Sequence, residues 1–144
     1  MMEVIRRKLR LIFLNLRPYR MEFDNHFWLA IIHLVFVVPL FLYVGFTRSE
    51  TPRWLYLALF AIGAVVLVYH GFKLAVRLST RSGYSWVNAI HIATVAPLLI
   101  YIGYHKKDTP RFAYELLLML GFAAAGYHLF SLVRQLEAHP EPQK

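Results

Sequence analysis

Four long apolar blocks dominate the sequence, and they constrain the fold more than any other feature. They run over residues 28–46, 54–72, 84–104 and 112–133. A helix rising about 1.5 Å per residue needs roughly 20 residues to cross the hydrocarbon core of a bilayer. The period-two alternation of a membrane β-barrel is absent from these blocks. We therefore predict an all-α fold with four transmembrane helices.

The composition also indicates lipid as the solvent. Hydrophobic residues make up 58% of the 144 positions, whereas soluble domains average roughly 45–50%. A chain this short cannot hide such an excess in one globular core. The chain has no cysteine, which excludes disulfides, thiolate metal sites, iron–sulfur clusters and covalently attached c-type haem.

The net charge of +8 is carried by the flanks and loops of the apolar blocks. We expect these cations to contact lipid headgroups, and we expect no nucleic-acid partner because no binding fold or basic–aromatic motif accompanies them. The two termini and the middle loop carry eleven Lys and Arg residues, and the other two loops carry five. By the positive-inside rule, we predict a multi-pass membrane protein with both termini on the cytoplasmic side.

The first 20 residues differ from the rest of the chain. Apolar residues fall on one helical face and arginines on the other, up to Arg17-Pro18. This pattern is typical of a basic amphipathic helix that lies in the membrane interface. It also suits docking, so we expect this helix to support a homo-oligomer or a larger membrane complex. Residues 137–144 are predicted to form a polar tail.

The two halves of the membrane region are copies of each other. Residues 28–78 align with 86–136 without a gap at a shift of 58, and 19 of 51 positions are identical. We therefore predict two tandem hairpins, 25–78 and 84–136. Since each hairpin is one up–down pair, both copies share one orientation and should be related by a pseudo-two-fold axis along the membrane normal. The expected product is a four-helix bundle.

Each predicted span contains one histidine that the other copy repeats. These are His33, His70, His91 and His128. An ionisable residue inside a membrane indicates function, and two imidazoles from opposed helices can hold a haem iron without any cysteine. The sequence thus favours haem b, with His33 and His91, and His70 and His128, as axial pairs. The repeated Gly63 and Gly121 would admit a flat porphyrin beside the histidines or bring a neighbouring helix close.

Other interpretations stay open. The four histidines could bind Zn, Cu or Fe directly, or relay protons or ions along the bundle. They could also form hydrogen bonds across helices in a non-enzymatic scaffold or assembly subunit that holds no cofactor. No nucleophile–base set, phosphate loop or paired carboxylate is present, which disfavours a hydrolase or transferase. A redox role in electron transfer, as in a cytochrome, is the enzyme-like alternative.

The second hairpin contains a recognisable set of sequence motifs. It reads Trp-Val-Asn-Ala-Ile-His, then Val-Ala-Pro-Leu-Leu-Ile-Tyr-Ile-Gly-Tyr, Thr-Pro-Arg and Gly-Tyr-His. With its counterpart, over about residues 25–136, it resembles uncharacterised small membrane proteins of large DNA viruses and related marine sequences. The resemblance implies a membrane protein, adds a structural role in a viral or host membrane, and brings no known activity or functional residues. The chain departs from the usual cytochrome b pattern, in which ligands are paired on the same helices, and this counts against a standard electron-transfer role.

Overall fold

The structure is a computed structural model that describes residues 25–80 and 85–137. Its four membrane-length segments are helical throughout. The predicted interfacial helix over 1–20 and residues 138–144 of the predicted tail lie outside the described residues.

The first and third spans are each built from three helical pieces and a final turn. The first contains α2 (Asn25–Ile32), the π-helical segment η1 (His33–Val37), α3 (Val38–Thr47) and the 3₁₀ turn η2 (Arg48–Glu50). The third contains α5 (Ser85–Ile90), the π-helical segment η3 (His91–Val95), α6 (Ala96–His105) and the 3₁₀ turn η4 (Lys106–Asp108). The matching order of pieces reflects the repeat.

The second and fourth spans are single long helices, α4 (Arg53–Ser79) and α7 (Arg111–Glu137). All four spans are long and apolar enough to cross a membrane. The structure thus confirms the predicted all-α fold with four membrane-spanning helices.

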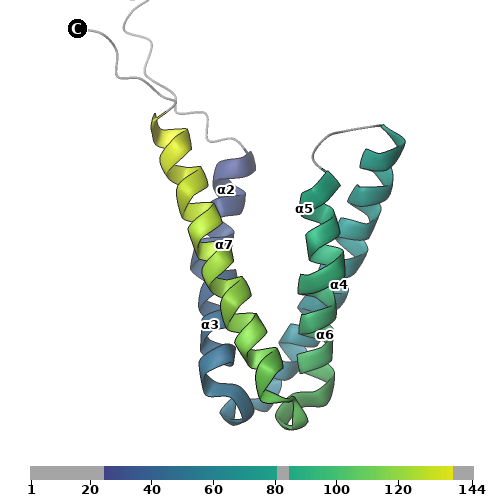
Figure 1. The fold of residues 1–144 in the computed structure, drawn as a ribbon, viewed down its shortest axis with the longest axis vertical. Helices are drawn as coiled ribbons and strands as arrows, with labels where there is room; N and C mark the ends of the chain where they lie inside the picture. Colours follow the sequence, from purple (N-terminus) through teal and green to yellow (C-terminus); the bar gives the residue numbers. More distant parts are fainter. Residues whose placement is uncertain (1–24, 81–84, 138–144) are drawn as a thin grey trace, which may run out of the picture.

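The four spans form two arms that meet at one end and separate toward the other (Figure 1). In the first arm α3 of span one packs on α7 of span four, and in the second arm α4 of span two packs on α6 of span three. The turns η2 and η4 lie together at the closed end. Each repeated hairpin therefore places its two helices in different arms, and each arm combines one span from each copy.

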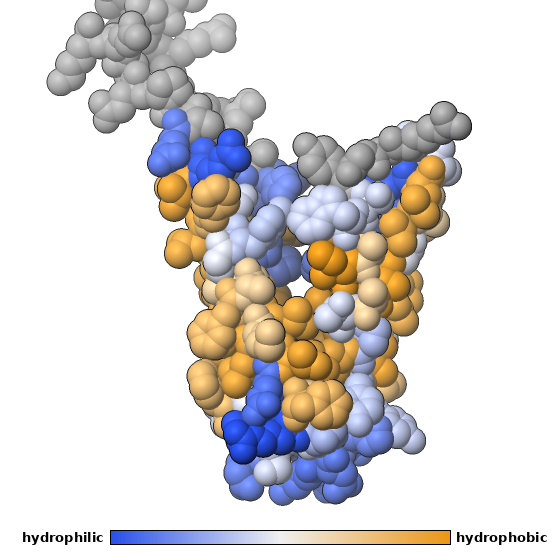
Figure 2. Space-filling view, viewed as in Figure 1, coloured by the Kyte–Doolittle hydropathy of each residue, from blue (hydrophilic) through white to orange (hydrophobic). Residues whose placement is uncertain are grey.

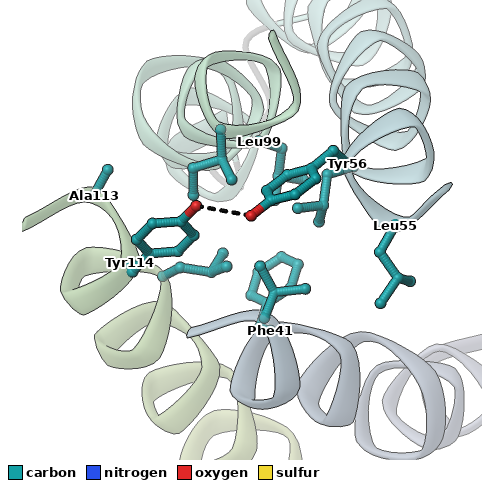
Figure 3. Close-up of a cluster of buried hydrophobic side chains, with 10 residues drawn as sticks. Phe41, Leu55, Tyr56, Leu99, Ala113 and Tyr114 are labelled. Carbon is teal, nitrogen blue, oxygen red and sulfur yellow. Dashed lines mark hydrogen bonds between the residues drawn. The ribbon is translucent and has the colours of Figure 1, made fainter. Parts of the chain in front are cut away.

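The buried core lies at the closed end. Ten residues contribute to it, from both arms: Phe41, Val44, Leu55, Tyr56, Leu59, Leu99, Ile102, Ala113, Tyr114 and Leu117. Figure 3 shows Tyr56 and Tyr114 pointing their hydroxyl groups toward each other in this core, and the two oxygens are 3.1 Å apart. Because the two tyrosines are 58 residues apart, they are equivalent positions of the two copies. Contact between equivalent residues is what a pseudo-two-fold axis through the core requires.

Glycines allow the two helices of each arm to approach closely. A Cβ atom added at Gly103 of α6 would lie 2.6 Å from the backbone nitrogen of Phe60 and 2.6 Å from the carbonyl oxygen of Tyr56, both in α4. A Cβ added at Gly45 of α3 would meet the side chain of Leu118 in α7 at 2.5 Å. Small residues at such positions let helix backbones pack in a membrane, where burial from water gives no driving force.

Gly63 and Gly121, which the sequence offered as room for a porphyrin, also face neighbouring helices. A Cβ at Gly63 would lie 2.9 Å from Ile100, and one at Gly121 would lie 3.2 Å from Leu42. Protein atoms already occupy the space beside both glycines. Of the two roles predicted for them, the structure supports helix packing, and we leave them out of the ligand site.

Large apolar side chains cover the outside of the arms. Phe36, Trp54, Val68, Phe72 and Tyr104 each expose about two-thirds or more of their surface. In Figure 2 apolar residues fill the middle of the molecule, and hydrophilic residues gather toward both ends. An apolar surface this extensive suits lipid and is unusual for a soluble monomer.

Candidate functional site

An opening separates the two arms above the core. In the space-filling view a gap between the arms is visible above the core (Figure 2). The arms are tied together by the core and by the neighbouring turns η2 and η4. Side chains on the inner faces of both arms can therefore meet one molecule held between them.

The four repeated histidines form two stacked pairs, one in each arm. In the first arm the ring centroids of His33 and His128 are 4.2 Å apart, with 29° between the ring planes. In the second arm those of His70 and His91 are 4.1 Å apart, with 13° between the planes. The direct ring contacts thus differ from the pairs predicted from the sequence, and each predicted axial pair takes one histidine from each arm.

The two stacked pairs belong to one cluster. His33 is close enough to interact electrostatically with His91 of the opposite arm. It is also within electrostatic range of His70, and His91 is within range of His128. These interactions are long-range, and His26 takes part in them as well through His128, so they place the four histidines at the same end of the molecule.

His33 and His91 are held in the same way in the two copies. The Nδ1 atom of His33 lies 2.8 Å from the carbonyl oxygen of Leu29, and that of His91 lies 2.7 Å from the carbonyl oxygen of Val87. A carbonyl oxygen can only accept a hydrogen bond, so each Nδ1 carries the proton. In the neutral form of such a ring Nε2 is unprotonated, and this is the form in which histidine binds metals.

The widened helical turn before each proline accounts for the position of these histidines. His33 and His91 are the first residues of the π-helical segments η1 and η3, which end just before Val38-Pro39 and Ala96-Pro97. Proline has no N–H group and its ring clashes with the carbonyl four residues earlier. A wider helical turn relieves this conflict, and such turns are frequent at functional sites.

His70 is oriented by a residue that the sequence analysis did not single out. Its Nδ1 atom lies 2.9 Å from Oδ1 of Asn88 in α5, and Asn88 is only 3% exposed. The signal that would have found Asn88 is an amide within an apolar span, at a position where the other copy has Ala30. His128 is 7% exposed and packs against the rings of His33 and Tyr127.

The part of the chain that the structure describes contains no preformed ligand set for a bare metal ion. No three histidine, aspartate or glutamate side chains there come together closely enough to hold a metal ion. Structural and catalytic zinc sites take three or four protein ligands. A haem iron has four ligands from its porphyrin and needs only two histidines from the protein.

Cations lie near the histidines toward the open end. Lys73 follows His70 by about one helical turn, and its Nζ atom is 5.3 Å from the centroid of the Tyr69 ring. Arg134 of α7 lies over the ring of Phe130 at 5.9 Å. Each arm therefore carries a positive charge beyond its histidine pair.

No protein family, no curated protein and no solved structure matches this chain.

Proposed function

We propose that this protein binds haem b between its two arms, with His33 and His91 as the axial ligands. The observation that carries the proposal is the matched state of these two imidazoles. Both are fixed through Nδ1 to a backbone carbonyl, which leaves Nε2 as the nitrogen that could bind iron. They come from opposite arms and are equivalent positions of the two copies.

The stacking geometry supports a ligand pair drawn from two arms. Two rings that face each other at about 4 Å cannot approach one iron from opposite sides, and this applies to both stacked pairs. An axial pair must then combine His33 or His128 with His70 or His91. His33 and His91 are equivalent in the two copies, are similarly held and are only partly buried, whereas His128 is buried.

The residues around the opening suit the porphyrin ring and the propionates of haem. The opening lies among apolar spans, as a porphyrin ring requires, and Lys73 and Arg134 carry positive charges for its propionates. When bound, haem would supply one-electron redox chemistry. The protein would supply two oriented nitrogens and a water-poor site, which supports a role in electron transfer across or along the membrane.

Titration of the purified, haem-free protein with hemin in detergent tests the proposal. We expect saturable binding with the absorption bands of a bis-histidine complex. We expect His33→Ala and His91→Ala each to abolish those bands, and His105→Ala to retain them. His105 is a suitable control because it ends α6 at the closed end, where it packs on Tyr101.

Binding of hemin by His33→Ala and His91→Ala as tightly as by the wild type would overturn this assignment. The proposed alternatives would then be tested on the same variants. Loss of proton flux in proteoliposomes would support a conduit, and unchanged flux together with co-purifying subunits would support a scaffold.

A further inference from the structure

The two arms differ at the position that faces the second ring of each histidine pair. In the second arm Asn88 contacts His70. The equivalent residue of the first copy is Ala30, which is fully buried and has no polar side-chain atom to offer His128. The repeat thus keeps four histidines but supplies an amide to only one of the two pairs.

The stacking geometry of the two histidine pairs also differs between the arms. The pair that Asn88 supports, His70 with His91, is nearly parallel at 13°. The pair without an amide, His33 with His128, is tilted by 29°. The more regular stack is therefore the one that has a hydrogen bond behind it.

Asn88 carries a buried polar group that an alanine would avoid, which makes its presence informative. Within the described residues its Nδ2 atom is buried and has no hydrogen-bond partner. A buried donor without a partner is unfavourable, and the alanine of the first copy avoids it. The amide oxygen, which contacts Nδ1 of His70, is the part of this side chain that contributes a hydrogen bond to the site.

We propose that Asn88 is a positioning residue that fixes the proton of His70 on Nδ1 and, through the stacked ring, sets the orientation of His91. An acceptor oxygen at 2.9 Å from Nδ1 selects the tautomer in which Nδ1 is protonated. Hydrogen-bond partners of this kind commonly orient histidines at metal sites, and here the oriented ring is His70, the stacking neighbour of the proposed ligand His91. The link to His91 rests on the haem site proposed above, whereas the effect on His70 does not.

The ligand-free protein gives the first test. The ¹⁵N spectrum of histidine-labelled protein in detergent distinguishes a protonated from an unprotonated ring nitrogen, and comparison with His70→Ala assigns the His70 signals. We expect His70 to have a protonated Nδ1 in the wild type. We expect Asn88→Ala to release this preference, and Asn88→Asp to keep it because a carboxylate also accepts the bond.

Two controls separate positioning from damage to the fold. Asn88→Ala reproduces the residue found at Ala30, so the helix contact should tolerate it, and unchanged helical circular dichroism would confirm this. Thr94→Ala removes an exposed polar group from the same span and should leave the His70 signals unchanged. An unprotonated Nδ1 on His70 in the wild type, or signals unaffected by Asn88→Ala, would overturn the proposal.

Hemin titration of the same variants tests the link to His91. We expect Asn88→Ala to weaken binding by less than the roughly 10–100-fold that follows loss of a direct partner of a metal ligand, because Asn88 reaches His91 only through the His70 ring. Thr94→Ala should bind as the wild type does. If the wild type takes up no hemin while its His70 tautomer depends on Asn88, the haem proposal fails and the positioning of His70 stands. If hemin binds and Asn88→Ala changes neither the tautomer nor the affinity, the haem proposal stands and this one fails.

Discussion

The hydroxyl oxygens of Tyr56 and Tyr114, equivalent residues of the two copies, lie 3.1 Å apart in the core that joins the arms. Each hydroxyl also lies within donating distance of a turn carbonyl, Tyr56 at 2.8 Å from Arg48 and Tyr114 at 2.9 Å from Lys106. A hydroxyl has one proton to donate. Two protons thus serve three contacts, and two of the three can be hydrogen bonds at any time.

This proton count predicts how the tyrosines contribute to stability. The wild type has two hydrogen bonds among these groups, either single Phe variant keeps one, and the double variant has none. We expect Tyr56→Phe and Tyr114→Phe each to lower the free energy of unfolding by about 1 kcal/mol. The double variant should lose at least the sum of the two. Unfolding in mixed detergent measures this, and a double variant less destabilised than that sum would disprove the count.

The turn at the closed end has a backbone conformation that favours glycine. Arg48 and Lys106 have φ values of 50° and 53°, and side chains adopt this region at a cost of about 1–3 kcal/mol. We expect Lys106→Gly to be more stable than Lys106→Ala by an amount in that range. Both variants remove the same charge, so the difference between their stabilities reports the backbone conformation at position 106. Equal thermal stabilities would show that the turn carries no strain.

Close helix contact in the second arm should make Gly103 intolerant of a methyl group. The atoms that an added Cβ would meet are backbone atoms of Tyr56 and Phe60, which can move only if the helices separate. We expect Gly103→Ala to cost about 1–3 kcal/mol, as overpacked cores do. Gly71→Ala is the matched control because nothing lies within 4 Å of its added Cβ. It should be neutral or more stable by up to about 1 kcal/mol.

Cross-linking can test which spans share an arm. The chain has no cysteine, and a Cβ added at Gly121 would lie 3.3 Å from Cβ of Phe41, near the roughly 3.5–4.5 Å of a disulfide. We expect oxidation to join Phe41→Cys with Gly121→Cys, which links span one to span four. The pair Phe41→Cys with Gly71→Cys should stay reduced. Maleimide labelling counts the free thiols, and the opposite pattern would contradict the arrangement of the arms.

The sequence predicts the elements well because lipid imposes a simple rule on them. Apolar length alone locates the spans, and the 58-residue repeat marks His33 and His91 as equivalent positions. The packing partners were harder to predict. A hairpin aligned on its copy looks the same whether its helices pack on each other or on the other copy. The tight contact of Gly103 with α4 shows the second arrangement.

The candidate site was predictable in membership but not in geometry. One histidine per span was evident from the repeat, whereas the stacking of His33 on His128 depends on which helices share an arm. Asn88 was missed because it is one of the many positions at which the copies differ, and nothing in the repeat marks it out from the others. Its contact with His70 exists only once α5 packs on α4.

The most direct test of haem binding between the arms is an absorption spectrum of the protein purified from haem-supplemented cells, oxidised and then reduced with dithionite. We predict a Soret band that sharpens on reduction, together with narrow α and β bands, in the wild type. We predict their loss when His33 and His91 are both replaced by alanine. A featureless visible spectrum of the folded wild-type protein would contradict the proposal.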